Sequence, residues 1–292
     1  MMEKLISKAA VLLEALPYMQ RFRSQTFVVK YGGSFMDSPD PEVRTGVARD
    51  VVFLEAAGID PIVVHGGGKA ISRAMEESGL QAKFVEGLRV TDEETVSVVD
   101  ETLSRQINPA IVDTINRLGG RAKGFAGTEI FKCKKFEPIG KDGKAHDIGY
   151  VGQVTEVNTA PLEECIAKNI TPVISPTALG EDGKIYNCNA DIAAAQTAIA
   201  LTAKRLVFMS DVPGLMRDPE DPETVIPHLR TQEVKALKEA GIIARGMIPK
   251  VDSAVEALHA GVTKVSFVDG RVNHAVLLEI FTDAGVGTEI VL

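Results

Sequence analysis

Three consecutive glycines, Gly66 to Gly68, separate an apolar run from the start of a helical pattern. The run at residues 62–64 is β-branched, as in a buried strand, and apolar residues recur at helical spacing from Ile71. A glycine backbone lets a ligand approach closely, and a helix N-terminus offers free N–H groups and a positive dipole end. The stretch therefore indicates either a cradle for a phosphate or carboxylate, or a tight strand-to-helix turn.

The stretch matches neither of two common nucleotide-binding patterns. Lys69 follows the glycines as a P-loop lysine would, but Val63 and Ala70 occupy the positions of the P-loop glycine and Ser/Thr. Ile71 stands where the dinucleotide pattern G-x-G-x-x-G requires its third glycine. The glycines alone therefore do not identify the ligand.

Two lysines occupy positions where an anion would bind. Lys30 lies near the end of a predicted strand at 26–31, beside Gly32 and Gly33, and ligands of open α/β sheets bind at the carboxyl ends of strands. The alternative is a lysine that reaches water from the strand edge. Lys250 lies in the first turn of a predicted helix, where a cation is unfavourable unless an anion is near.

Further polar residues precede or follow predicted strands. Asn187, Asn189 and Asp191 alternate along an extended segment before a helix, so they are predicted to share one face. A ligand or catalytic role is favoured for this row over simple helix capping. Arg89 lies in a predicted hairpin and could bind a carboxylate, but pattern alone favours a surface ion pair, for example with Glu86.

Strand and helix patterns alternate along most of the chain, which predicts an α/β fold with a mainly parallel sheet covered on both faces. The remaining predicted strands lie at residues 121–125, 130–136, 150–157, 171–175, 205–210 and 264–268. The predicted helices lie at 41–57, 92–117 with a kink at Pro109, 161–169, 231–240 and 273–282. Asp92 is predicted to cap the second of these helices.

Composition narrows the class of protein. The chain has 292 residues, of which 45% are apolar and 25% charged, with a net charge of −8, so we expect a packed globule. The acidic balance, the lack of a basic tract and the absence of Trp argue against nucleic-acid binding. Cys133, Cys165 and Cys188 are scattered, which favours a reducing, cytoplasmic setting. The apolar runs are shorter than the roughly 20 residues that span a membrane.

The N-terminal segment, residues 1–22, is predicted to form an amphipathic helix. Apolar residues recur at helical spacing between Leu5 and Met19. Such a helix needs a surface to cover. Its own domain is favoured as that surface, and a neighbouring subunit is the alternative.

Six motifs occur in a fixed order: K-Y-G-G at 30–33, V-V-H-G-G-G at 63–68, G-L-R-V-T-D at 87–92, N-C-N-A-D at 187–191, S-D-V-P-G-L at 210–215 and G-M-I-P-K-V at 246–251. Over essentially its whole length the chain resembles the N-acetylglutamate kinases of the amino acid kinase superfamily. The resemblance implies a three-layer αβα sandwich in a single domain, residues 1–292. An amino-acid-binding N-lobe is implied at about 24–175 and an ATP-binding C-lobe at about 176–292.

The resemblance also implies roles for individual residues. Lys30 and Lys250 match the lysines that contact the transferring phosphoryl group, and Asp191 matches the aspartate that orients them. The other implied ligand-binding positions are Gly32 and Gly33 for phosphate, Gly66, Gly67, Arg89 and Asn187 for N-acetylglutamate, and Ser210 and Asp211 for ATP. Mg²⁺ is expected to arrive with the nucleotide, without a metal site of the protein's own.

A regulatory site is implied at the C-terminus. The N-terminal helix and residues 274–288 resemble arginine-inhibited members that form hexamers, as trimers of dimers, and a PII-type signalling protein is a candidate partner. Glu279 and Gly285 match arginine-binding positions; the alternative is that Glu279 is a surface acid on an ordinary helix.

The chain departs from the family pattern at several positions: Ser34 replaces a common asparagine, and the region around 124–131 is shortened. Lys69 replaces a common proline, and Ser266 stands where arginine-sensitive relatives often carry histidine.

The implied reaction is ATP-dependent phosphorylation of the side-chain carboxylate of N-acetyl-L-glutamate, in arginine biosynthesis and under feedback by arginine. This chemistry needs positioning and charge neutralisation more than a general base, because the carboxylate is already ionised. The alternatives are a kinase for a related acid, such as an aminoadipate derivative or glutamate, or a non-catalytic arginine sensor. Such a sensor would be expected to have lost Lys30, Asp191 or Lys250, and all three are present.

Overall fold

A computed structural model describes residues 2–32, 40–140, 143–244 and 246–292. Its centre is an eight-stranded sheet. In spatial order the strands are β12 (His228–Arg230), β14 (Thr288–Val291), β13 (Lys264–Asp269), β11 (Arg205–Ser210), β1 (Thr26–Tyr31), β2 (Asp60–His65), β8 (Thr171–Ile174) and β5 (Ala122–Phe125). Neighbouring strands run parallel except β13 and β14. The predicted mainly parallel sheet is confirmed.

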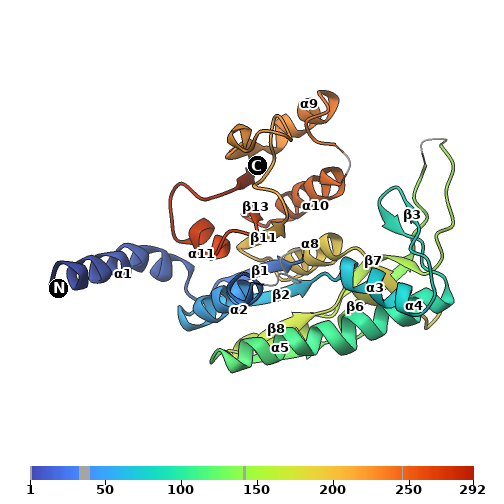
Figure 1. Cartoon of the computed structure of the whole chain (residues 1–292), viewed down its shortest axis with the longest axis horizontal. Helices are drawn as coiled ribbons and strands as arrows, with labels where there is room; N and C mark the ends of the chain where they lie inside the picture. The colour runs from blue at the N-terminus through green and yellow to red at the C-terminus, as the bar shows by residue number, and fades with distance from the viewer. Residues whose placement is uncertain (1, 33–39, 141–142, 245) are drawn as a thin grey trace.

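Helices cover both faces of this sheet, which confirms the three-layer sandwich (Figure 1). Helices α2 (Pro41–Ala56), α5 (Asn108–Arg117) and α11 (Ala275–Ile280) share one apolar core with side chains of β1 and β2. Helices α7 (Ala160–Ala167), α8 (Ala190–Ala200) and α10 (Met247–His259) form the core on the other face. Each central strand is therefore buried on both sides, as its continuous apolar run predicts.

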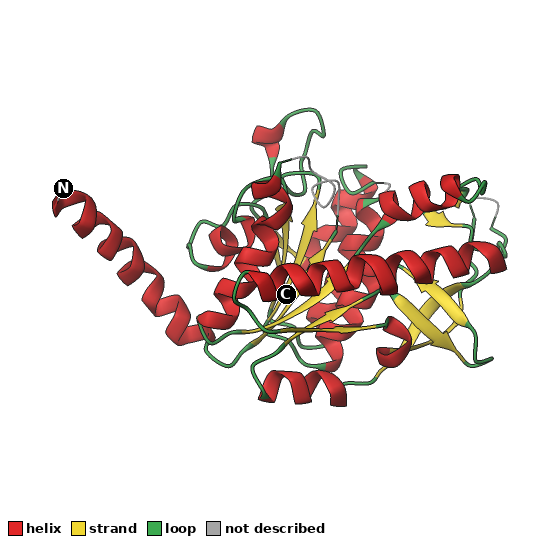
Figure 2. Cartoon of the chain, turned by 60° about the horizontal axis from the view of Figure 1, so that its bottom comes forward, coloured by secondary structure: helices red, strands yellow, loops and turns green. Residues whose placement is uncertain are grey.

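A small closed barrel adjoins the main sheet, on the far side of the molecule from the N-terminal helix (Figure 2). Its strands are β6 (Phe131–Lys135), β7 (Val151–Val157), β9 (Thr177–Gly180) and β10 (Ile185–Cys188), with the short α6 (Gly127–Ile130) before it. The sequence predicts β6 and β7 as strands but not β9, and not the closure. The predicted hairpin is confirmed as β3 (Phe84–Val85) and β4 (Leu88–Arg89).

The long predicted helix consists of three segments. Asp92 caps α4 (Glu93–Asp100) by accepting from the N–H of Thr95 at 2.8 Å, as predicted. A π-helical segment, η2 (Glu101–Ile107), then leads into α5. Pro109 lies in the first turn of α5, where a proline is tolerated because its missing N–H costs little. The irregularity that was expected at Pro109 lies instead in the π-helical segment before it.

The remaining elements surround this framework. The helix expected over 231–240 is a 3₁₀ turn, η4 (Thr231–Glu233), followed by α9 (Val234–Glu239). Helix α3 (Gly68–Glu77) follows the three glycines. The short η3 (Pro222–Thr224) and the strands β12 and β14 were not predicted. The division into two lobes stays a prediction.

The N-terminal helix α1 (Met2–Phe22) projects away from the rest of the chain (Figures 1 and 2). Among the side chains that the structure describes, those of the last turns pack on the domain: the Tyr18 hydroxyl donates to Asp283 at 2.5 Å, and the Phe22 ring packs edge-on against Phe27. Its exposed apolar side chains are Met2, Leu5, Ile6, Val11, Leu12, Leu13 and Leu16. The helix is confirmed, but the expectation that it covers its own domain is wrong for most of its length.

A buried carboxylate joins α2 to α11. Asp50 is 1% exposed, lies 2.7 Å from Nδ1 of His274 and accepts from the N–H groups of Val276 and Leu277. Burial raises the pKa of Asp50 to about 6, although these hydrogen bonds and His274 oppose the rise. The folded state therefore favours the protonated form of this carboxyl group more than the unfolded chain does.

This raised pKa predicts a pH-dependent stability. The contribution of Asp50 is fully present below its unfolded pKa of 3.8 and is lost as pH rises through about 6. Relative to Asp50→Asn, which cannot ionise, the wild type should lose about 3 kcal/mol of unfolding free energy between pH 4 and 7. Denaturant titrations of both proteins across this range measure the difference. Parallel pH profiles would contradict the prediction.

Candidate active site

Three charged side chains from three distant elements meet at one point. Lys30 near the end of β1 lies with its ammonium 3.1 Å from Oδ1 of Asp191, in the first turn of α8. Lys250, in the first turn of α10, donates to Oδ2 of the same carboxylate at 2.5 Å. The Lys30 and Asp191 side chains are each 10% exposed and that of Lys250 is 18% exposed. The structure thus brings together the three residues that the resemblance names as catalytic.

The electrostatics of this triad keep its carboxylate ionised. Burial alone would raise the pKa of Asp191, but the two ammonium groups outweigh that effect and hold it at about 2. Burial also lowers the pKa of Lys250 in spite of its ion pair with Asp191. Oδ1 of Asp191 is buried and makes only the ion pair with Lys30. One carboxylate faces two cations, so the group as a whole is electropositive and suited to a further anion.

The glycine loop borders this triad. A Cβ atom on Gly32 would lie 3.0 Å from the Lys30 ammonium, and one on Gly67 would lie 2.5 Å from Cδ1 of Ile107, so a larger residue at either position would displace these side chains. The N–H of Gly66 donates to the carbonyl of Tyr31 at 2.7 Å and is not available to a ligand. The N–H of Gly67 has no partner among the residues described, and the helix start at Gly68 leaves further N–H groups free. Gly33 and Ser34 lie outside the described residues.

A cleft of about 260 Å³ connects these groups. It is lined, among others, by the predicted residues Lys30, Gly32, Gly66, Gly67, Arg89, Asn187 and Asp191. The lining thus combines the glycine loop and two members of the triad, Lys30 and Asp191, with residues of the hairpin and of barrel strand β10, and Lys250 reaches this group through its ion pair with Asp191. The arrangement suits a small acid whose anionic groups face cations and N–H groups.

Arg89 is 7% exposed, so the surface ion pair that pattern favours is wrong. Its Nη2 donates to the carbonyl of Gly68 and to Oγ of Ser72, both at 2.9 Å, and the guanidinium lies over the Phe84 ring. Burial lowers the pKa of Arg89. Within the described chain no carboxylate pairs with it, which leaves its charge to be neutralised by a ligand in the cleft.

The row of Asn and Asp residues divides between two functions. Asn187, on β10, lines the cleft and donates to Oγ1 of Thr91 at 3.3 Å. The Asn189 side chain accepts from the N–H groups of Asp191 and Ile192 and so caps α8. Asp191 already belongs to the helix, so the three do not share an extended segment. Asn189 is therefore a helix cap, as the alternative prediction had it. The positions of Asn187 and Asp191 agree with the prediction of a ligand-binding or catalytic role.

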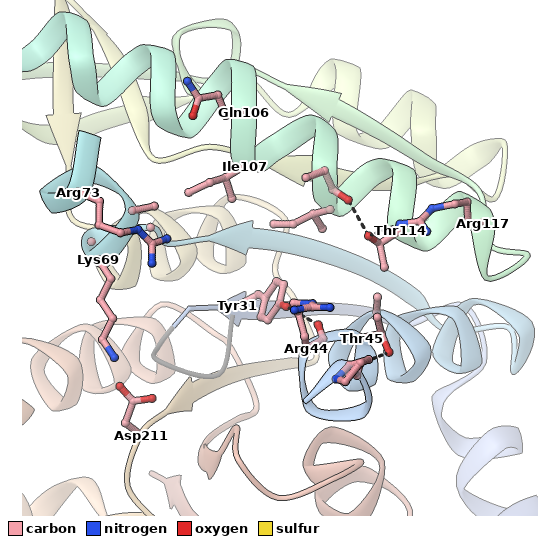
Figure 3. A pocket seen from close by; sticks show the side chains of 17 residues that line it. Tyr31, Arg44, Thr45, Lys69, Arg73, Gln106, Ile107, Thr114, Arg117 and Asp211 are labelled. Atoms are coloured by element: carbon pink, nitrogen blue, oxygen red, sulfur yellow. Dashed lines mark hydrogen bonds between the residues drawn. The ribbon is translucent and has the colours of Figure 1, made fainter. Parts of the chain in front are cut away.

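The predicted nucleotide residues lie at the end of β11. Ser210 is buried and its hydroxyl donates to the carbonyl of Val212 at 3.1 Å. Asp211 lines a second cavity, of about 820 Å³, which shares Gly67 and Gly68 with the cleft. In this cavity the side chain of Lys69 extends from α3 toward Asp211 (Figure 3). Lys69 therefore faces Asp211, and it does not line the cleft that Lys30 and Asp191 line.

The predicted regulatory residues also lie close together. Glu279 is 5% exposed and accepts from Oγ of Ser266 at 2.8 Å and from the N–H of Val286 at 3.1 Å. Gly285 has a positive φ of 63°, and a Cβ atom there would lie 2.7 Å from Oε2 of Glu279. The alternative of a surface acid is therefore wrong. Ser266, at the position where histidine was expected, binds Glu279 directly.

Comparison with known proteins agrees with this geometry. Residues 25–269 match the model of the amino acid kinase family. The chain is 48% identical to an acetylglutamate kinase of Akkermansia muciniphila over 99% of this chain and 97% of that one. It is 45% identical to the acetylglutamate kinase of Aquifex aeolicus over the full length of both.

Among solved structures, an N-acetylglutamate synthase of Neisseria gonorrhoeae superposes with a TM-score of 0.81 at 26% identity, covering 97% of this chain and 63% of the synthase. A Giardia carbamate kinase, with a TM-score of 0.67 at 12% identity over 92% of this chain and 99% of that one, shares the fold. The chain belongs to the amino acid kinase family. Within that family it groups with the acetylglutamate kinases, to which it is 45–48% identical over nearly its whole length.

No cluster of three or more His, Cys, Asp and Glu side chains among the described residues is arranged to hold a metal ion. None of the described helices is both long and apolar enough to cross a membrane. The one acid between the lysines is already neutralised by them, so the site fits an anionic ligand that brings its own metal.

The triad makes a prediction about stability. Asp191→Asn leaves two buried ammonium groups without a counter-charge, so the free energy of unfolding should fall by about 3 kcal/mol. Asp113→Asn is the matched control, because it breaks the exposed ion pair with Arg117 and should cost less than about 1 kcal/mol. Denaturant unfolding at pH 7 measures both. Equal losses would contradict the assignment of a buried, charge-balancing Asp191.

Proposed function

We propose that this chain transfers the γ-phosphoryl group of ATP to the side-chain carboxylate of N-acetyl-L-glutamate, forming N-acetyl-L-glutamyl 5-phosphate in arginine biosynthesis. The observation that carries the proposal is the Lys30–Asp191–Lys250 triad beside a glycine loop. The similarity to acetylglutamate kinases over the whole chain supports the choice of substrate.

The proposed chemistry follows from charge. A carboxylate oxygen attacks the γ-phosphorus, the bond between that phosphorus and the β,γ-bridging oxygen breaks, and ADP leaves with the bond's electron pair. No proton moves, so no general base is required. Lys30 and Lys250 neutralise the anions that must approach each other, and the N–H groups at Gly67 and the start of α3 bind the phosphoryl oxygens. Mg²⁺ bound to the nucleotide adds further positive charge.

Other residues position the two substrates. Arg89 binds a carboxylate of N-acetylglutamate, because its buried guanidinium lines the cleft without an acidic partner among the described residues. Asn187 lies on the same wall and supplies an amide for a polar group of the substrate. Ser210 and Asp211 mark the nucleotide side, at the carboxyl end of β11.

Regulation by arginine is part of the proposal. Glu279 is buried beside Gly285, and a buried carboxylate suits a cationic ligand. A related N-acetylglutamate synthase, 26% identical with a TM-score of 0.79, has been solved in complex with L-arginine. An arginine ligand must here replace or share the hydrogen bond from Ser266 to Glu279.

Assembly through α1 is the second regulatory element. Its exposed apolar residues would be covered if two such helices packed together, which supports a hexamer built by linking dimers. Three buried, free cysteines agree with a cytoplasmic location. A PII-type signalling protein stays a candidate partner on family grounds.

The proposed reaction is tested by trapping the acyl phosphate with hydroxylamine. With ATP and Mg²⁺, N-acetylglutamate should give hydroxamate and glutamate should give little. Lys30→Ala and Lys250→Ala should each lower kcat by about a hundredfold or more, since each removes a charge that stabilises the transferring group. Lys132→Ala, which breaks an exposed ion pair with Glu156, is the control and should be neutral. Activity with glutamate alone, or a Lys30→Ala enzyme at the wild-type rate, would refute the proposal.

Deleting residues 1–20 should lower the molar mass in light scattering from that of a hexamer to that of a dimer. The arginine dose–response should shift to higher concentration in the same variant, while the uninhibited kcat changes little, because the triad lies far from α1 along the sheet. Leu12→Ser and Leu13→Ser together test the apolar face without truncation. An unchanged mass and dose–response would exclude α1 as the linking element.

A further inference from the structure

His65, the last residue of β2, is fully buried and lies directly before the glycine loop. Its Nδ1 is 2.9 Å from the carbonyl oxygen of Gly66, and its Nε2 is 3.3 Å from Nδ2 of Asn108. Both ring nitrogens thus have partners, although the sequence offered no role for this residue. Burial lowers the pKa of His65 to about 4, so the ring is neutral near pH 7.

The surroundings of Asn108 determine which ring nitrogen carries the proton. Nδ2 of Asn108 lies 2.9 Å from the carbonyl oxygen of Val173 and 3.4 Å from that of Phe125. Carbonyl oxygens only accept, so the NH₂ group of the amide must face them. The same NH₂ group faces Nε2 of His65 at 3.3 Å, so a proton on Nε2 would point at another donor, and the unprotonated form of this nitrogen is favoured. The proton of the neutral ring then resides on Nδ1, which donates to the carbonyl of Gly66.

The hydrogen bond to Gly66 acts on the next amide. A trans peptide is planar, and its N–H points opposite to its C=O. When His65 holds the carbonyl of Gly66, it also directs the N–H of Gly67 away from the histidine side of the loop. That N–H has no partner among the described residues, and Gly67 lines the cleft of the triad.

Glycine makes such a restraint necessary, because its backbone has more conformational freedom than that of any other residue. Within the loop, Gly66 and Gly67 are each held by one further backbone bond: the N–H of Gly66 donates to Tyr31, and the carbonyl of Gly67 accepts from the N–H of Ile71. Neither of these bonds determines the rotation of the Gly66–Gly67 peptide plane as directly as a bond to its own carbonyl oxygen.

We propose that His65, oriented by Asn108, is a positioning residue that aims the Gly67 N–H at the transferring phosphoryl group. The inference rests on the proposed phosphoryl transfer for its ligand, but the tautomer of His65 follows from the hydrogen bonds alone. His65 touches no substrate in this scheme. It acts through the peptide plane that joins Gly66 to Gly67.

Two substitutions separate this role from mere packing. His65→Leu keeps the bulk and removes the donor, so kcat should fall by about ten- to a hundredfold, with KM for N-acetylglutamate within about twofold. His65→Asn places an amide donor near the position of Nδ1 and should recover most of kcat. His259→Leu, an exposed histidine on α10, is the control and should be neutral. Wild-type kcat in His65→Leu, or an equal loss in both His65 variants, would overturn the proposal.

A second measurement holds even if a His65 variant fails to fold. In the ¹⁵N-labelled wild-type protein, long-range ¹H–¹⁵N spectra should show His65 protonated at Nδ1 and unprotonated at Nε2 from pH 8 to about 5. A ring protonated at Nε2, or one that titrates near 6.5, would overturn the orientation by Asn108. This spectrum needs no substrate, so it separates failure of the positioning role from failure of the proposed reaction, which would appear as an inactive wild type.

Discussion

The active site depends on one buried carboxylate that balances two cations. Lys30 and Lys250 come from opposite ends of the chain, and without Asp191 between them their charges would repel in a site with little water. The pKa of about 2 for Asp191 means that this balance holds throughout the neutral range. The arrangement keeps both ammonium groups close together and leaves one net positive charge for anions that arrive.

The topology of the sheet brings the two lysines, the aspartate and the glycine loop together. Strands β1, β2 and β11 are neighbours and parallel, so their carboxyl ends deliver Lys30, the glycine loop and Ser210 to one edge. Helix α8 begins at the same edge directly after β10, a barrel strand, and thereby brings Asp191 next to Lys30. Apolar cores on both faces of the sheet fix these ends relative to each other.

Periodicity and short motifs were enough to predict six of the eight strands of the main sheet, most helices and the residues of the triad, because these signals are local or belong to a widespread pattern. Burial was not predictable in the same way. The pattern around Arg89 favoured a surface ion pair, and pattern alone left a surface position open for Glu279, yet the folded chain buries both side chains. The proposed role of His65 could not be predicted from the sequence, because its partner Asn108 is 43 residues away and approaches only when α5 packs on the sheet. Strand β9 and the barrel closure likewise depend on pairing between separate segments.

The glycine loop resembles a P-loop in sequence, but its lysine does not lie where a P-loop lysine would. G-G-G-K suggests a lysine poised over phosphates, yet Lys69 lines the neighbouring cavity with Asp211 and is not part of the cleft of the triad. The N–H of Gly66, the first glycine, is already bonded to β1, so the anion must be met by Gly67 and the residues after it. The positive charge comes instead from Lys30 and Arg89, which line the cleft, and from Lys250, which is ion-paired with Asp191. In the sequence Lys30 lies 36 residues before Gly66, and Lys250 lies 184 residues after it. A loop that offers only backbone groups therefore needs a charged partner from elsewhere in the fold, and the Asp191 triad supplies it.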